Sequence, residues 1–159
     1  MVLDLIPAAV ASLAAVLDVR WRRIPNWLVL IAFGTGLLSN LLRAGASGAM
    51  LALLGAALGM LLLLPFYRLG AVGAGDVKLL AALGALVGPH ALVSVALYAA
   101  VVGGAISCVV LARRRRLGLA LREIGARPTQ LSRSGIRAPY GVAIASGVYL
   151  SMLLPSVIG

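Results

Sequence analysis

Gly73-Ala74-Gly75-Asp76-Val77-Lys78 leads directly into the apolar run Leu79-Leu80-Ala81-Ala82-Leu83-Gly84, so a carboxylate and an ammonium stand at the mouth of an apolar segment. In a chain that is 62% hydrophobic and 11% charged, an ionisable residue beside a bilayer is costly and marks a candidate functional site. The chain's four acidic residues are Asp4, Asp18, Asp76 and Glu123. The rest of the sequence decides which of them can meet.

The composition excludes an ordinary soluble domain, in which roughly 25% of residues are charged. A membrane-spanning helix needs about 20 mostly apolar residues. The 159 residues therefore predict an all-α, polytopic bundle of about six transmembrane helices, forming one integral-membrane domain over residues 1–159. The net charge of +10 lies in loops beside apolar runs, which favours a membrane surface over nucleic acid as its partner. Because Cys108 is the single cysteine, neither a disulfide framework nor a zinc site is expected, and we expect no cofactor and no metal.

The apolar runs and the turn residues between them give the expected helices. These are residues 2–19, 27–42, 46–65, 76–87, 91–112 and 140–158. Ile24-Pro25-Asn26 predicts a tight turn, because proline cannot continue a helix and disfavours one just before it. The fourth helix is only about 18 Å long at 1.5 Å per residue, shorter than the ~30 Å hydrocarbon core. We therefore expect it to begin below the membrane surface, in a protein-lined pocket that water can enter.

The basic residues orient this bundle. Every lysine and arginine except Arg43 falls on one side of the expected membrane, so the positive-inside rule makes that side cytoplasmic and places both termini outside. Residues 113–138 form the expected basic cytoplasmic loop, in which Arg113, Arg114, Arg115 and Arg116 would lie against anionic lipid headgroups. The first helix then reaches the cytoplasmic face with Asp18, and the fourth leaves it with Asp76. We therefore expect these two aspartates to meet at one membrane depth.

Two carboxylates that share a site cannot both ionise cheaply, so one keeps its proton while the other is charged. Such a pair supplies a base that takes a proton from water and an acid that protonates a carbonyl or a leaving amine, as in aspartic proteases. We expect Gly73 and Gly75 to adopt backbone angles that are closed to other residues and to admit a substrate strand.

Each of these residues also has a structural interpretation. Asp18 could be a helix-end carboxylate paired with neighbouring arginines, and Asp76 could be the N-cap of its helix. Lys78 could pair with a lipid phosphate instead of contacting a substrate. Gly55-xxx-Gly59 and Gly84-xxx-Gly88 are typical of close helix packing.

Three ordered motifs resemble those of one protease family. Residues 73–79 resemble the GxGD signature of intramembrane aspartic proteases, in the form typical of bacterial prepilin peptidases. Asp18, with the arginines and Ile24-Pro25-Asn26 that follow it, resembles the first catalytic motif of the same family. Residues 138–147 resemble its C-terminal motif, as found in the small peptidases of Tad-type (Flp) pilus systems.

The resemblance implies an aspartic endopeptidase of the bacterial inner membrane that removes the short basic leader of type IV-like, Flp-type prepilins at the cytoplasmic face. Asp18 and Asp76 would be the catalytic pair. The residues that would shape the site or bind substrate are Gly73, Gly75, Lys78, Pro139, Tyr140 and Gly141. The sequence lacks the N-terminal methyltransferase region of the larger family members and its cysteine tetrad, so the resemblance does not extend to methylation or zinc binding.

A second hypothesis is a non-catalytic membrane subunit or a small proton or cation transporter that uses the same Asp18/Asp76 pair. A transport route would need further polar residues across the membrane. The expected helices 27–42, 46–65 and 91–112 contain no acidic residue, so the sequence favours the enzyme.

Overall fold

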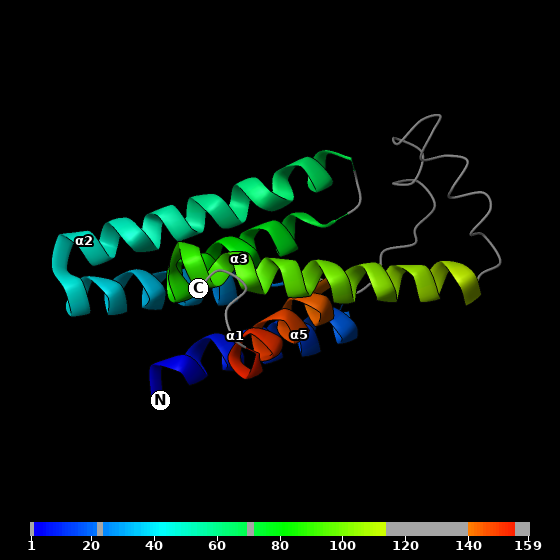
Figure 1. The fold of residues 1–159 in the computed structure, drawn as a ribbon, viewed down its shortest axis with the longest axis horizontal. Helices are drawn as coiled ribbons and strands as arrows, with labels where there is room; N and C mark the ends of the chain where they lie inside the picture. The colour runs from blue at the N-terminus through cyan, green and yellow to red at the C-terminus, as the bar shows by residue number, and fades with distance from the viewer. Residues whose placement is uncertain (1, 22–23, 70–71, 114–139, 155–159) are drawn as a thin grey trace.

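The computed structural model describes residues 2–21, 24–69, 72–113 and 140–154. These residues form four helices, α1 (Val2–Trp21), α2 (Asn26–Arg68), α3 (Ala74–Arg113) and α5 (Tyr140–Leu153), and the described part of the chain contains no strand. The helices pack side by side (Figure 1). The predicted all-α fold class is confirmed.

The two longest helices each change direction at a glycine. In α2 the break lies at Ala44 (φ −132°, ψ 18°) and Gly45 (φ 60°, ψ −142°), and the positive φ is one that glycine adopts without steric penalty. Residues 26–43 and 46–68 consequently run in opposite directions (Figure 1). In α3 the break is Gly88 (φ 80°, ψ 170°), and Pro89 follows it. The four helices therefore contain six straight segments within the described residues.

These six segments correspond to the six expected helices, with some ends displaced. The helix that carries Asp18 extends to Trp21 instead of residue 19, and α3 begins at Ala74, two residues before the predicted start. The last helix begins at Tyr140 as predicted and ends at Leu153, and residues 155–158 of the predicted range lie outside the described residues.

Two stretches of the described chain are long and apolar enough to cross a membrane, Asn26–Arg68 and Ala74–Ile106. A straight α2 of 43 residues would be about 65 Å long, roughly twice the hydrocarbon core. Its break at Gly45 lets it fold back on itself. The number of crossings and the side on which each terminus lies remain predictions.

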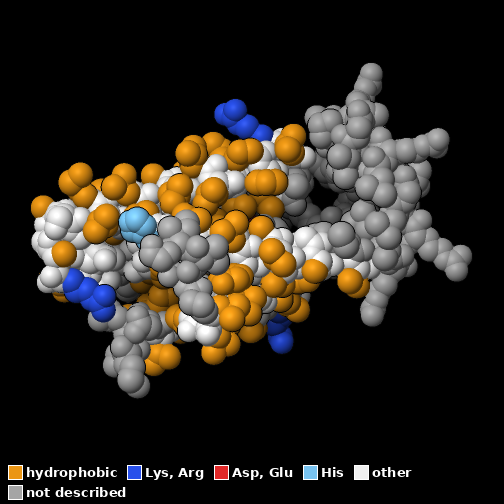
Figure 2. All heavy atoms as spheres, in the orientation of Figure 1, with side chains coloured by type: hydrophobic (Ala, Val, Ile, Leu, Met, Phe, Trp, Pro, Cys, Tyr) orange, Lys and Arg blue, Asp and Glu red, His pale blue; other side chains and the backbone are white. Residues whose placement is uncertain are grey.

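The surface of the helices is apolar. Leu30, Leu42 and Val101 are 69%, 77% and 72% exposed. Figure 2 shows apolar side chains covering most of one face, with lysine and arginine side chains at a few places near its edge. Lipid accepts such a surface, whereas soluble proteins rarely expose contiguous apolar patches of more than a few hundred Å².

The first segment of α3, residues 74–87, forms the centre of the core. Leu79 and Leu83 are fully buried, and backbone contacts hold the segment against both halves of α2. A Cβ added at Gly36 would lie 2.7 Å from the Ala85 carbonyl carbon, and one added at Gly55 would overlap the Gly84 carbonyl. The expectation that glycines permit close packing is confirmed at Gly55 and Gly84, as it is at Gly59, where a Cβ would lie 2.5 Å from the Leu80 carbonyl oxygen.

Helix α5 connects α1 to the rest of the bundle. It packs against α3, where a Cβ added at Gly147 would lie 2.5 Å from the Val95 carbonyl oxygen. On its other side it packs against α1, and the Ser12 and Tyr149 hydroxyls lie 2.6 Å apart. Since α1 makes most of its interhelical contacts with α5, the position of α1 depends mainly on the last helix.

Candidate active site

Asp76 is the third residue of α3 and is only 8% exposed. Its Oδ2 accepts a hydrogen bond of 3.0 Å from the Gly73 N–H, and its own N–H donates to the Gly73 carbonyl at 3.1 Å. This is half of a capping box, in which the third helical residue satisfies the N–H of the residue that precedes the helix. The interpretation of Asp76 as the N-cap is therefore wrong by position, because Gly73 occupies the N-cap and Asp76 caps it from inside the helix.

The expectation that Gly73 and Gly75 adopt backbone angles closed to other residues is wrong, and the expectation that they admit a substrate strand remains a prediction. Within the described residues a positive φ occurs only at Gly45 and Gly88, so neither glycine of the motif needs a backbone angle that is closed to other residues. A Cβ at Gly73 would lie 3.2 Å from Asp76 Oδ2, and a Cβ at Gly75 would lie 3.2 Å from the Ile24 Cβ. These glycines leave room for the carboxylate and for the chain that follows α1.

Asp18 lies in the last turn of α1 and is half-buried. Its Oδ2 accepts a hydrogen bond of 2.9 Å from the N–H of Gly141, the second residue of α5. A Cβ at Gly141 would lie 2.9 Å from both the Cβ and the Oδ2 of Asp18, so only glycine fits there without displacing the aspartate. The N-terminus of a helix is a favourable place for a carboxylate, because its N–H groups are unpaired and its dipole is positive.

Both aspartates are therefore held in the same way, each by a glycine N–H at the N-terminus of a helix. They also lie at the same end of the bundle. Ile24 follows Asp18 by six residues and contacts Gly75, which is the immediate neighbour of Asp76.

Lys78 lies on the surface two residues after Asp76 and donates a hydrogen bond of 3.2 Å to Asn26 Oδ1 at the start of α2. The contact ties the beginnings of α2 and α3 together. Asn26 and Ile24 are the residues of this region for which the sequence predicted only a turn. Both residues belong to the motif that follows Asp18, which marks them as candidates for the site. No spacing rule, however, indicates which residues they would contact.

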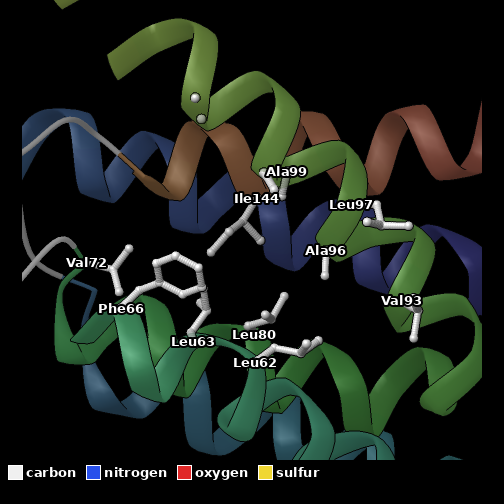
Figure 3. A pocket seen from close by; sticks show the side chains of 13 residues that line it. Leu62, Leu63, Phe66, Val72, Leu80, Val93, Ala96, Leu97, Ala99 and Ile144 are labelled. Carbon is white, nitrogen blue, oxygen red and sulfur yellow. The ribbon is translucent and has the colours of Figure 1, made fainter. Parts of the chain in front are cut away.

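An apolar cavity of about 430 Å³ lies beside the Asp76-bearing segment of α3 and beside α5 (Figure 3). Its walls come from the end of α2, both segments of α3, and α5. They comprise Leu62, Leu63, Phe66, Val72, Leu80, Val93, Ala96, Leu97, Ala99, Ala100, Gly103, Gly104 and Ile144. Val72 immediately precedes Gly73, and Ile144 lies three residues after Gly141. The cavity thus begins beside the glycines that hold the aspartates and extends along α3.

Some of the predicted site residues lie outside this description. Pro139 and the loop arginines Arg114, Arg115 and Arg116 are outside the described residues, as are the side chains of Arg113 and Tyr140. Their expected roles remain predictions.

Comparison with known proteins identifies one family. Residues 5–108 match the sequence model of the type IV leader peptidase family. The matched part includes Asp18 and residues 73–78, and it ends before α5. A search of curated proteins and a search of solved structures each give no match.

Proposed function

We propose, because the chain belongs to the type IV leader peptidase family, that it is an aspartic endopeptidase whose substrate is a Flp-type prepilin. The family consists of membrane-embedded proteases that act on prepilin leaders. In this proposal the chain cleaves the short basic leader from the prepilin at the cytoplasmic face of the bacterial inner membrane.

The equivalent placement of Asp18 and Asp76 carries the proposal. Each carboxylate has its Oδ2 oriented by a glycine N–H, at the same end of the bundle and within the part of the chain that matches the family. A group oriented before the substrate arrives needs no reorganisation during the reaction, which is where much of an enzyme's rate advantage originates.

The chemistry we propose is general acid and base catalysis by this pair. The ionised aspartate takes a proton from a water molecule, whose oxygen attacks the scissile carbonyl carbon. The protonated aspartate gives its proton to the carbonyl oxygen, forming a tetrahedral intermediate. Collapse of the intermediate breaks the C–N bond. The proton taken from water goes to the leaving amine, and a hydroxyl of the intermediate returns a proton to the other aspartate as the carboxylic acid forms, so the pair regains its starting state.

The apolar cavity supports a membrane-embedded substrate. Its lining contains no charged side chain, and it includes Val72, next to Gly73, and Ile144, three residues after Gly141. We propose that it receives apolar residues of the prepilin that follow the scissile bond, while the basic leader lies outside the apolar region.

The charges at the two ends of the bundle support the proposed orientation. Of the described basic side chains, Arg20, Arg68 and Lys78 lie at the aspartate end, and Arg43 lies near the break of α2 at the opposite end. With six membrane crossings, the positive-inside rule places the aspartates at the cytoplasmic face and both termini outside.

Leader removal in cells tests the proposal. The chain is expressed together with a Flp-type prepilin, and Asp18→Asn and Asp76→Asn are compared with the control Asp4→Asn, which changes an aspartate near the other end of α1. We expect the wild type and Asp4→Asn to shorten the prepilin and both site variants to leave it intact at equal membrane levels. Cleavage by either site variant would remove that aspartate from the mechanism.

A further inference from the structure

The first segment of α3 leaves a backbone carbonyl without an intrahelical hydrogen-bond donor at the end opposite Asp76. The helix breaks at Gly88, so the carbonyls of its last turn lack intrahelical donors. For the Ala85 carbonyl the donor would be the N–H of residue 89, which is a proline and has none. Ala85 is fully buried, and an unsatisfied carbonyl in apolar surroundings is strongly unfavourable.

Asn40 supplies the missing donor from another helix. Its Nδ2 donates to the Ala85 carbonyl at 3.0 Å and to the Gly36 carbonyl of its own helix at 2.9 Å. The amide reaches α3 because Gly36, one turn earlier on the same face, brings the two backbones into contact. Asn40 thus acts as a side-chain cap for a helix that it does not belong to.

The capped segment is also the one that carries Asp76. From Asp76 to Ala85 is nine residues, about 14 Å along a helix axis. Over so short a distance a helix behaves as a rigid rod, so an axial or rotational shift at Ala85 moves Asp76 as well. We infer that Asn40 is a positioning residue, which sets the place of Asp76 from the far end of its helix. Its relevance to cleavage rests on the proposed function, whereas its effect on the position of α3 does not.

The position of the start of α3 can be measured without reference to activity. The Cβ of Ile24 lies 3.2 Å from the place of a Cβ at residue 75, close to the 3.5–4.5 Å typical of a disulfide. A chain with Ile24→Cys, Gly75→Cys and Cys108→Ser should therefore form a disulfide readily in membranes under mild oxidant, and the rate reports how well residue 75 is aligned with residue 24.

Asn40→Ala is introduced into this chain and compared with Ser39→Ala. Ser39 is the matched control, since its hydroxyl bonds the same Gly36 carbonyl but no other helix. We expect Asn40→Ala to slow disulfide formation roughly three- to fifteen-fold, the range for loss of one interhelical hydrogen bond, and Ser39→Ala to leave it unchanged. Equal rates in the two variants would overturn the inference.

Cleavage by the chain without the added cysteines gives the second readout. Asn40→Ala should lower kcat with little change in KM, because it displaces Asp76 without altering the substrate contacts, and a rise in KM alone would contradict this.

If Asn40→Ala fails to accumulate, Asn40→Gln replaces it. Its amide is displaced by one methylene, so a slower disulfide than in Ser39→Ala supports the inference and an equal rate refutes it. Failure of the parent chain to cleave any prepilin would count against the proposed function, and the disulfide comparison would still decide the role of Asn40.

Discussion

Gly141→Ala isolates the contact that holds Asp18. The new methyl group would lie 2.9 Å from the Asp18 Cβ and Oδ2, about half an ångström closer than ordinary van der Waals contact begins. Because the Asp18 Cβ is attached directly to the α1 backbone, the clash cannot be relieved by rotating the carboxylate alone. Either α1 or the start of α5 must move, and the 2.9 Å hydrogen bond from the Gly141 N–H is lost or lengthened.

The size of the effect follows from that hydrogen bond. A hydrogen bond to a charged group contributes about 1.5–3 kcal/mol, which corresponds to a roughly ten- to hundred-fold change in the population of correctly oriented Asp18. The intrinsic preference of the backbone acts in the opposite direction, since alanine favours a helix over glycine by about 1 kcal/mol. A loss of activity in Gly141→Ala therefore cannot come from a weaker α5.

The assay is the initial rate of leader removal by purified protein in detergent or nanodiscs, normalised to folded protein. Gly34→Ala is the control, because a Cβ there meets nothing within 4 Å. We expect Gly141→Ala to cleave at least tenfold more slowly and Gly34→Ala to match the wild type. A Gly141→Ala variant that accumulates normally and cleaves at the wild-type rate would refute the claim that this N–H positions Asp18 for catalysis.

Three further predictions use other contacts of the structure. Gly104→Leu should raise KM by filling the apolar cavity, which its open Cβ position allows, while Gly34→Leu leaves KM unchanged; equal KM values would exclude the cavity from substrate binding. Lys78→Ala and Asn26→Ala should each reduce cleavage only about two- to fivefold, the effect of one exposed hydrogen bond, and the double variant should lose no more than either single; additive losses would mean separate roles. Gly55→Ala should reduce the membrane level and thermal stability because its methyl overlaps an α3 carbonyl, and a stability equal to that of Gly34→Ala would contradict the packing.

Much of the fold follows from the sequence because its main signals are local. Apolar runs define the helical segments, and the Gly88-Pro89 pair predicts a break, which the structure contains. Helix α3 begins two residues earlier than the predicted range 76–87. Propensity alone does not distinguish an aspartate at the N-cap from one at the third helical position, where it also satisfies a backbone N–H.

The candidate site was predictable in its location but not in its contacts. Alternation of the helices across a membrane indicates that Asp18 and Asp76 lie at one end, and the structure places them there. The hydrogen bond of Asp18 to Gly141 joins residues 123 positions apart and depends on the rotation of α1 against α5, which no local pattern specifies. The same holds for Asn40, whose partner depends on how closely Gly36 lets two backbones approach.

The link between Asp18 and Gly141 also sets the order in which the protein becomes competent. Helix α1 is translated before α5, so Asp18 leaves the ribosome well ahead of the amide that orients it, which follows 123 positions later in the chain. Until α5 has been translated and inserted, α1 lacks the helix against which it mainly packs. A nascent or prematurely terminated chain therefore presents one held aspartate and one loose one. Both aspartates are therefore oriented only in molecules in which α5 has been made and has packed against α1.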